Sequence, residues 1–362
     1  MLRLAVIRPV SQTYHRPSVR SARPRRLLTA LAGALAVIAL VGAPAYASTL
    51  VIEGAGDGHG VGMSQDGALG YAEHGYSDAA ILAHYYTSTT LGSAPAKATI
   101  RVLVGNTVLK LPLERYVRGV VSAEMPASWP LAALEAQAIA SRTYALTADA
   151  GGSRFNVYSD TRSQVYLGKA AETARTNAAV ADTAGQIVLY DGKPATTYFF
   201  ASSGGETENI QDSFLGASAE PWLRAVPDPY ETAATHWKLS VGFTTVAREL
   251  SGLLKGSLRG IEVLERGSSP RIVAAEVLGS RGDTAISGPE LAGRLGLDST
   301  WAYFSVRNGA VVKREPDRSG QAPLPTPPPA SPAPAAPVPV SGEGGGAQAP
   351  GEASPTGGAS PG

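Results

Sequence analysis

Apolar side chains recur every three or four positions in two adjacent stretches, which is the spacing typical of helices with one buried face. In the first stretch, which leads to the acidic residue Glu124, these positions are Tyr116, Val117, Val120 and Val121. The second stretch predicts a helix from Pro130 to about Ala148, with proline at the first helical position. One narrow face of it carries mostly small residues: Leu134, Gln137, Ala138, Ser141 and Ala145. Small side chains allow close approach, so we predict that this helix is central and buried.

Shorter patterns predict the other elements. Runs rich in β-branched or alternating residues predict strands at 50–54, 98–105, 163–168, 239–245, 260–266, 270–280 and 303–312. Helical spacing predicts helices at 77–86, 170–185 and 287–297. Within 185–205, Asp191-Gly192 lies between two apolar runs, which is typical of a tight hairpin turn. No regular βαβ repeat is visible. We therefore predict an α+β fold, with a mixed or antiparallel sheet packed around the central helix, in a single large domain with room for a small subdomain.

The two ends of the chain differ from this middle part. Residues 1–47 join a basic stretch, an apolar run and the sequence "AYA", the three parts of a secretory signal peptide, with cleavage expected after Ala47. The alternative is a signal anchor that stays in the membrane. Residues 314–362 are rich in Pro, Gly, Ala and Ser, which predicts a disordered tail. The folded domain is therefore predicted at 48–313, in a protein secreted to the cell wall.

Charge and cysteine content exclude several functions. The chain has 31 Lys+Arg and 30 Asp+Glu, and residues 1–47 hold seven of the arginines and no acid, so 24 basic residues face 30 acidic ones after cleavage. That balance of about −6 gives no basis for nucleic-acid binding. The chain has no cysteine, which excludes a thiol nucleophile and a thiolate zinc site. The histidines after Ala47 show no metal-binding spacing.

Several segments together resemble the stage II sporulation protein D family, which includes the amidase-enhancer proteins. They are "GHGVGMSQDGALGYAEHGYSDAAILAHYY", "ERYVRGVVSAEMPASWPLAALEAQAIASRTYAL", "DTRSQVYLG", "TYFFASSGGETE", "EPWLRAVPDPYE" and "ISGPELAGRLGLDSTW", and they span roughly 50–310. The resemblance implies peptidoglycan as substrate. It also implies lytic transglycosylase activity, a lyase reaction that leaves a 1,6-anhydro end, with Glu124 as the catalytic acid.

Two departures from the family pattern matter. The "GHGVGMSQ" block usually follows the other motifs, whereas here it comes first, as after a circular permutation. The start of the folded part, 50–92, should then pack against its end near 300–313, because permutation is tolerated where termini are close. Some members also hold zinc with His and Cys around the "DT…QVY" block. This chain has Arg162 and Ser163 there, so we predict no metal and no cofactor.

A single carboxylate fits the implied chemistry. Ordinary glycoside hydrolysis uses two carboxylates. A lytic transglycosylase needs one acid, because the C6 hydroxyl of the substrate is a tethered nucleophile of high effective concentration. Burial among Val121, Met125, Pro126 and Trp129 would raise the pKa of Glu124, whereas the N-terminus of the following helix would lower it. The alternative role for Glu124 is a surface or capping residue.

Other polar residues are weaker candidates for glycan contact, and each has a structural alternative. The predicted substrate-binding set is His59, Ser64, Gln65, Gln137, Arg142, Tyr144, Asp160, Gln164, Ser202, Ser203, Gly204, Gly205 and Thr207. The expected partners are peptidoglycan glycan strands and a cell-wall amidase, with no nucleic acid, and with a membrane if the signal segment is not cleaved. The alternative function is a non-catalytic, glycan-binding amidase enhancer that regulates a cell-wall hydrolase.

Overall fold

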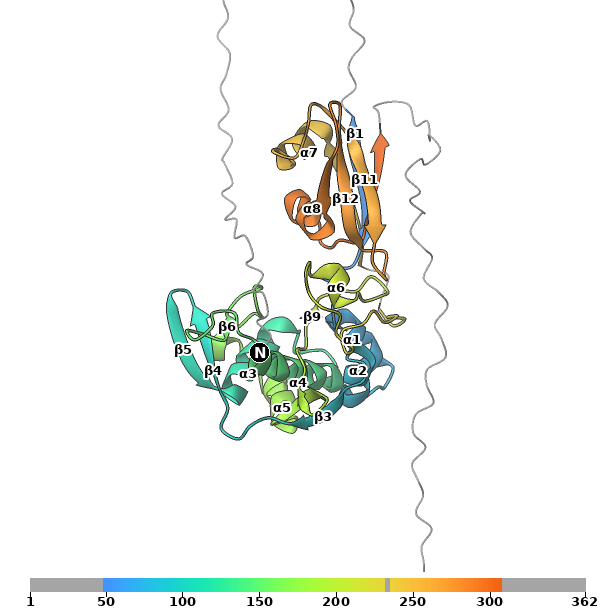
Figure 1. Ribbon diagram of the computed structural model, residues 1–362. Coiled ribbons are helices and arrows are strands. Elements are labelled where there is room, and N and C mark those ends of the chain that lie inside the picture. The colour runs from blue at the N-terminus through green and yellow to red at the C-terminus, as the bar shows by residue number, and fades with distance from the viewer. Residues whose placement is uncertain (1–47, 232–234, 308–362) are drawn as a thin grey trace, which may run out of the picture. The chain divides into compact units, whose positions relative to one another are not determined.

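The computed structural model describes residues 48–231 and 235–307. The predicted signal peptide and tail, and residues 308–313 of the predicted domain, lie outside the described residues. Within them, helices and small sheets alternate along the chain, which confirms the α+β prediction (Figure 1). None of the helices in the described ranges is long and apolar enough to cross a membrane.

The described helices are α1 (Gln65–Glu73), α2 (Asp78–Tyr85), α3 (Leu113–Glu124), α4 (Leu131–Thr147), the 3₁₀ helix η1 (Gly168–Ala171), α5 (Ala174–Asp182), α6 (Ile210–Ser213), α7 (Phe243–Glu249) and α8 (Gly288–Leu295). The strands are β1 (Thr49–Ala55), β2 (Met63–Ser64), β3 (Thr90–Ser93), β4 (Thr99–Val104), β5 (Thr107–Pro112), β6 (Val157–Tyr158), β7 (Gln186–Tyr190), β8 (Lys193–Pro194), β9 (Phe199–Phe200), β10 (His236–Gly242), β11 (Leu258–Arg266), β12 (Ile272–Gly279), β13 (Thr284–Ser287) and β14 (Ala302–Arg307). They form sheets of two or three strands, antiparallel except for the β2–β9 and β4–β6 pairs.

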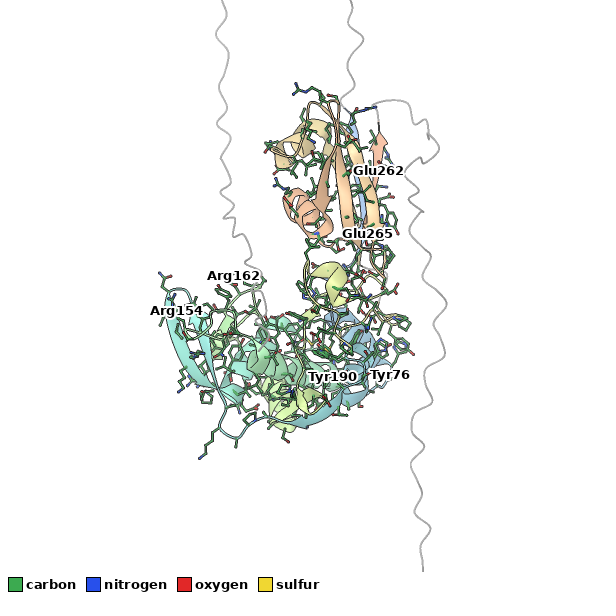
Figure 2. All side chains as sticks on the ribbon, in the orientation of Figure 1. Tyr76, Arg154, Arg162, Tyr190, Glu262 and Glu265 are labelled. Atoms are coloured by element: carbon green, nitrogen blue, oxygen red, sulfur yellow. The ribbon has the colours of Figure 1, made fainter. Side chains whose placement is uncertain are left out.

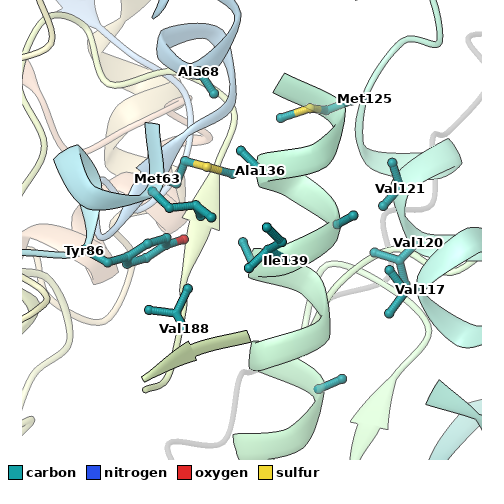
Figure 3. Close-up of a cluster of buried hydrophobic side chains, with 14 of the residues drawn as sticks. Met63, Ala68, Tyr86, Val117, Val120, Val121, Met125, Ala136, Ile139 and Val188 are labelled. Atoms are coloured by element: carbon teal, nitrogen blue, oxygen red, sulfur yellow. The ribbon is translucent and has the colours of Figure 1, made fainter. Parts of the chain in front are cut away.

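Helix α4 is the buried centre of the larger core, as predicted. It begins directly after Pro130, and its residues from Ala136 to Thr143 are all buried. Figure 3 shows Ala136 and Ile139 of α4 between Met63, Tyr86 and Val188 on one side and the valines of α3 on the other. Because the alanine and serine side chains of α4 are small, other helices can pack closely against several of its faces and place their polar residues beside it.

A second core is formed by two three-stranded sheets, β10-β1-β14 and β11-β12-β13, and by the helices α7 and α8. Its central strand, β1, pairs with β14 in antiparallel register, with Ile52 opposite Phe304. The predicted meeting of the start and end of the folded part is thus confirmed for residues 302–307. The permutation that motivated it stays a prediction.

The glycine-rich segment 56–62 connects the two cores. Its backbone bonds to two distant parts of the chain: the Asp57 N–H donates to Ser202 O at 2.9 Å, and the Gly58 N–H donates to Asp298 O at 2.8 Å. Gly56, Gly58, Gly60 and Gly62 all have positive φ, a conformation that other residues rarely adopt. Two residues after the segment, Ser64 caps α1 by accepting the Gly67 N–H. This path brings Gln65 to the centre of the larger core.

Replacing Gly62 with alanine should lower the free energy of unfolding by about 1–3 kcal/mol more than the same change at Gly75. Both changes strain a backbone with positive φ, and only the change at Gly62 adds overpacking. Both glycines have nearly equal φ, 80° and 83°. A Cβ at position 62 would lie 2.1 Å from Tyr198 O, whereas one at position 75 meets nothing within 4 Å. Urea unfolding of the two variants measures the difference. Equal losses would contradict the close packing of this segment against β9.

One predicted strand is wrong and another is wrong in part. Residues 163–168 contain no strand, because backbone N–H groups there bond outside any sheet: Val165 donates to Glu124 Oε1 and Leu167 donates to Gly119 O. Gly168 begins η1 instead. Residues 243–245 begin helix α7 instead of ending a strand, and the core there receives Val246.

The other element predictions hold with shifted bounds. Helix α5 begins at Ala174, after Thr173 forms a reciprocal capping box with Thr176. The hairpin turn at Asp191-Gly192 is confirmed, with positive φ at both residues, and it joins β7 to β8. Helix α8 has Ser287 as its cap, whose side chain accepts the Glu290 N–H.

Candidate functional site

Glu124 is the last residue of α3 and is half-buried. The helix stops there because the residue before Pro126 is forced into an extended conformation, as Met125 shows. The carboxylate accepts two hydrogen bonds: Oε1 from the Val165 N–H at 2.6 Å, and Oε2 from the Gln65 side chain at 3.2 Å. Burial raises the pKa of Glu124, and these two donors lower it by less. The raising effect of burial was expected from the sequence, whereas the lowering comes from these two donors and not from the N-terminus of α4.

Three predicted site residues form a buried chain of hydrogen bonds beside Glu124. Gln65 Nε2 donates to Gln137 Oε1 at 3.3 Å as well as to Glu124. Gln137 Nε2 donates to Ser141 Oγ at 2.9 Å, and Gln164 Nε2 donates to Ser141 O at 3.2 Å. The structure therefore brings Gln65, Gln137 and Gln164 together around the carboxylate, and each is less than a tenth exposed.

A second cluster gathers more of the predicted residues around Glu231. Among the described residues, the donors to its carboxylate are the hydroxyls of Ser64, Ser202 and Ser203 and the backbone N–H groups of Ser203 and Gly204. Ser64 directly precedes Gln65, so this cluster adjoins the Glu124 chain. Glu231 was not predicted as a site residue.

Asp228 completes this second cluster and is 1% exposed. Its Oδ2 accepts from the Tyr85 hydroxyl at 2.9 Å and lies 3.0 Å from the Ser203 hydroxyl. Burial and then the neighbouring Glu231 raise the pKa of Asp228 to about 7. The predicted Gly205 accepts the Asp228 N–H through its backbone oxygen, and the predicted Thr207 pairs with Val226 in the same loop.

His59 lies in an aromatic enclosure. Its ring is 5.1 Å from that of Phe214 and 5.4 Å from that of Phe200. Its Nδ1 accepts the Val61 N–H at 3.0 Å. Burial, and then the Arg271 charge, lower the pKa of His59 to about 4, so the imidazole is neutral at neutral pH. One ring nitrogen is thereby committed to the backbone of the glycine-rich segment.

Tyr144 and Asp160 have different surroundings. The Tyr144 ring packs against Tyr198 at 5.9 Å, and burial raises the pKa of its hydroxyl to about 12. Asp160 is half-buried and pairs with Arg162, which holds the pKa of Asp160 below its usual value. Arg162, labelled in Figure 2, also stacks 3.8 Å from the centre of the Tyr158 ring. Neither Tyr144 nor Asp160 belongs to the buried chain of hydrogen bonds at Glu124.

Arg142 is completely buried and pairs with Glu114 through two hydrogen bonds of 2.8 Å. Its other bonds go to the backbone oxygens of Gln186 and Val180. All of these partners belong to the protein, so the guanidinium ties α4 to α3, α5 and β7.

Replacing Glu114 with alanine should lower the free energy of unfolding by about 2–3 kcal/mol, near the low end for a broken buried ion pair, because Glu114 is itself partly exposed and two carbonyl bonds remain. Thermal and urea unfolding would measure the loss. Replacing the exposed pair member Glu290 with alanine serves as control and should cost less than about 1 kcal/mol. A loss at Glu114 no larger than at Glu290 would contradict the structural role of Arg142.

In the part of the chain that the structure describes, no group of three or more His, Asp or Glu side chains is close enough to hold a metal ion. The carboxylates of the second cluster are instead occupied by hydroxyl and backbone donors.

Comparison with known proteins finds relatives that are similar to much of this chain. The family model described as "Stage II sporulation protein" matches residues 105–190, which contain Glu124, Gln137 and Gln164 but not Gln65. The Stage II sporulation protein D of Bacillus subtilis (strain 168) is 31% identical over 243 residues, which is 62% of this chain and 68% of that protein. That of Bacillus amyloliquefaciens is 28% identical over similar shares. The Amidase enhancer of B. subtilis is 40% identical over 111 residues, 31% of this chain and 14% of that protein.

Proposed function

Because the chain belongs to the stage II sporulation protein D family, we propose that it is a secreted lytic transglycosylase that cleaves peptidoglycan glycan strands, with Glu124 as general acid and base. Membership of this family and similarity to an amidase enhancer support a cell-wall-related role. The finer assignment rests on one observation: a half-buried carboxyl whose pKa is raised by burial and whose two oxygens are both held by donors.

The reaction needs one proton carrier. In the first half, protonated Glu124 gives its proton to the glycosidic oxygen while the bond from that oxygen to the anomeric carbon breaks. In the second half, the C6 hydroxyl of the same sugar attacks the anomeric carbon and gives its proton to the Glu124 carboxylate. The new bond closes the 1,6-anhydro ring, and the enzyme returns to its starting state without water entering the product.

The environment of Glu124 suits both halves. Burial keeps the acid protonated to a higher pH than an exposed glutamate. The Val165 N–H and the Gln65 amide stabilise the carboxylate once it has given up the proton. A carboxyl group with a raised pKa and donors to its ionised form is matched to a proton that leaves and returns.

Secretion is part of the proposal because the substrate lies outside the cytoplasm. It rests on the basic stretch, apolar run and "AYA" sequence within residues 1–47. Fusing residues 1–47 to a reporter that is active only after export would test it.

The catalytic proposal is tested by incubating the purified protein with glycan strands, with and without stem peptides, and analysing the products by mass spectrometry. Fragments with 1,6-anhydro ends, lighter by one water than hydrolysis products, are the expected result. Fragments with reducing ends would mean hydrolysis and would require a second carboxylate.

The amidase-enhancer role is the second candidate, because a relative named Amidase enhancer is similar to part of this chain. In that role the protein would bind glycan and stimulate a partner amidase without cleaving glycan itself. Glycan binding without any cleavage, together with faster release of stem peptides when a cell-wall amidase is added, would favour this function over the transglycosylase.

A further inference from the structure

The two oxygens of Glu124 differ in the kind of partner that holds each one. Oε1 accepts a backbone N–H, that of Val165, at 2.6 Å. A backbone N–H cannot rotate away or accept a proton, so Oε1 stays an acceptor in both charge states of the acid. Oε2 accepts from a side-chain amide at the longer distance of 3.2 Å. The hydrogen bond to Oε2 is the longer and weaker one, so a proton on Oε2 disturbs the donors less than a proton on Oε1.

The partner of Oε2 is itself held in place. Gln65 Nε2 has two hydrogens, and both are used, since it donates to Glu124 Oε2 and to Gln137 Oε1. Gln137 presents its oxygen to Gln65 because its own nitrogen donates to Ser141 Oγ. This order of donors and acceptors specifies which end of the Gln65 amide faces the carboxylate.

Gln65 also reaches the site from a distant part of the sequence, 59 residues before Glu124. It is the first residue of α1, and Ser64 before it caps that helix and donates to Glu231. The Asp66 N–H after it donates to Ala201 O at 2.9 Å. Its backbone is thus anchored on both sides, and its side chain is 7% exposed.

On the basis of the proposed function, we propose that Gln65 is a positioning residue that holds Oε2 of Glu124 as the proton-carrying oxygen. Its amide aims that oxygen and stabilises the carboxylate after the proton has left. The glycine-rich segment before α1 therefore supports the acid through Gln65, in addition to any contact that it makes with glycan.

The test compares the wild type with Gln65→Met, which keeps the length of the side chain and removes the donor. The protein is labelled with ¹³C at glutamate side-chain carboxyls, and the Glu124 signal is the one missing from Glu124→Gln. Loss of the donor should move the pKa of Glu124 upward, because the charged form loses a hydrogen bond. In glycan cleavage, kcat should fall about 10- to 100-fold with KM unchanged, as expected for lost alignment. The alkaline limb of the pH profile should move to higher pH.

A second variant and a control keep the result interpretable. Gln65→Glu places a second carboxyl beside Oε2, so the two groups should titrate as a coupled pair. Gln211→Met removes a half-buried amide on α6 and should leave the Glu124 titration unchanged. An unmoved Glu124 titration in both Gln65 variants would overturn the proposal, even if the wild type cleaves glycan. A moved titration in a protein without cleavage activity would keep the positioning role and overturn the proposed function.

Discussion

Replacing Glu124 with glutamine should lower the rate of glycan cleavage by about 10²- to 10⁴-fold, the usual contribution of a general acid and base. Glutamine has nearly the shape of the protonated acid and keeps an oxygen for the Val165 N–H, which donates to Glu124 at 2.6 Å. It has no proton to give to the glycosidic oxygen and cannot accept one from the C6 hydroxyl. The rate of appearance of 1,6-anhydro ends, measured by mass spectrometry, gives the size of the effect, while glycan affinity should change little.

The matched control is Glu135→Gln on α4. Burial also raises the pKa of Glu135, but this residue is outside the hydrogen-bond chain around Glu124. The Glu135→Gln variant should keep the wild-type cleavage rate. That result would show that the slower cleavage by Glu124→Gln comes from loss of the catalytic acid and not from loss of any partly buried carboxyl. Cleavage by Glu124→Gln within tenfold of the wild type would remove Glu124 from the mechanism and direct the search to another carboxyl.

The central part of the fold could be predicted because local patterns determine it. Tyr116, Val117, Val120 and Val121 recur at helical spacing, and all four are buried in α3. The small residues of α4 predicted its central place, and Gln137 is fully buried on its expected face. These features depend on periodicity within one helix, which a single sequence displays directly.

The errors came where distant partners decide the local structure. The run 163–168 is rich in strand-forming residues, yet its N–H groups serve Glu124 and Gly119 instead of a neighbouring strand. Its backbone has a function in the site that no local propensity indicates. Glycan contact by residues 202–204 stays a prediction, but their donors meet Glu231, 27 to 29 residues later, a partner that no local pattern indicates.

Glu231 and Asp228 illustrate what the sequence could not reveal about the site. Both lie in residues 220–231, a segment that resembles the family but shows no recognisable catalytic pattern. Ser64 is 167 residues before Glu231, so nothing local signals their contact. The sequence pattern that could have indicated this cluster is two acidic residues three positions apart and a pair of serines elsewhere. Many surface loops share that pattern, so it does not identify a site.

Asp228 alone should lower the free energy of unfolding by about 4 kcal/mol between pH 4 and pH 7. Its pKa is about 7 in the folded protein and about 3.9 in the unfolded chain, and each pKa unit corresponds to about 1.4 kcal/mol. The sign follows from proton binding. Between those two values the folded state holds a proton that the unfolded state has released, so the Asp228 contribution to stability is largest below pH 4. It decreases as pH rises and levels off above pH 7.

The hydrogen bonds give an independent reason for a proton on Asp228. The Ser203 hydroxyl has one hydrogen but lies within bonding distance of both Asp228 Oδ2 and Glu231 Oε2. It also accepts the Gly205 N–H at 3.0 Å. Glu231 has donors on both oxygens, which suits an ionised carboxylate. If Ser203 donates to Glu231, Asp228 must supply the hydrogen of the other contact, as a neutral acid does.

Asp228→Asn tests this account, because asparagine has the shape of neutral aspartate and does not ionise. Urea unfolding at several pH values should show a slope between pH 4 and pH 7 that is smaller than in the wild type by the Asp228 share. Asp66 has a pKa of about 6, raised by burial and then by Glu231 and Asp57, so it keeps part of the slope in both proteins. Glu231→Gln is the contrasting variant: its amide hydrogens would face the donors of Ser202 and Ser203, so it should destabilise at every pH. An unchanged slope in Asp228→Asn would mean that Asp228 is ionised in the folded protein and that Ser203 bridges two negative charges.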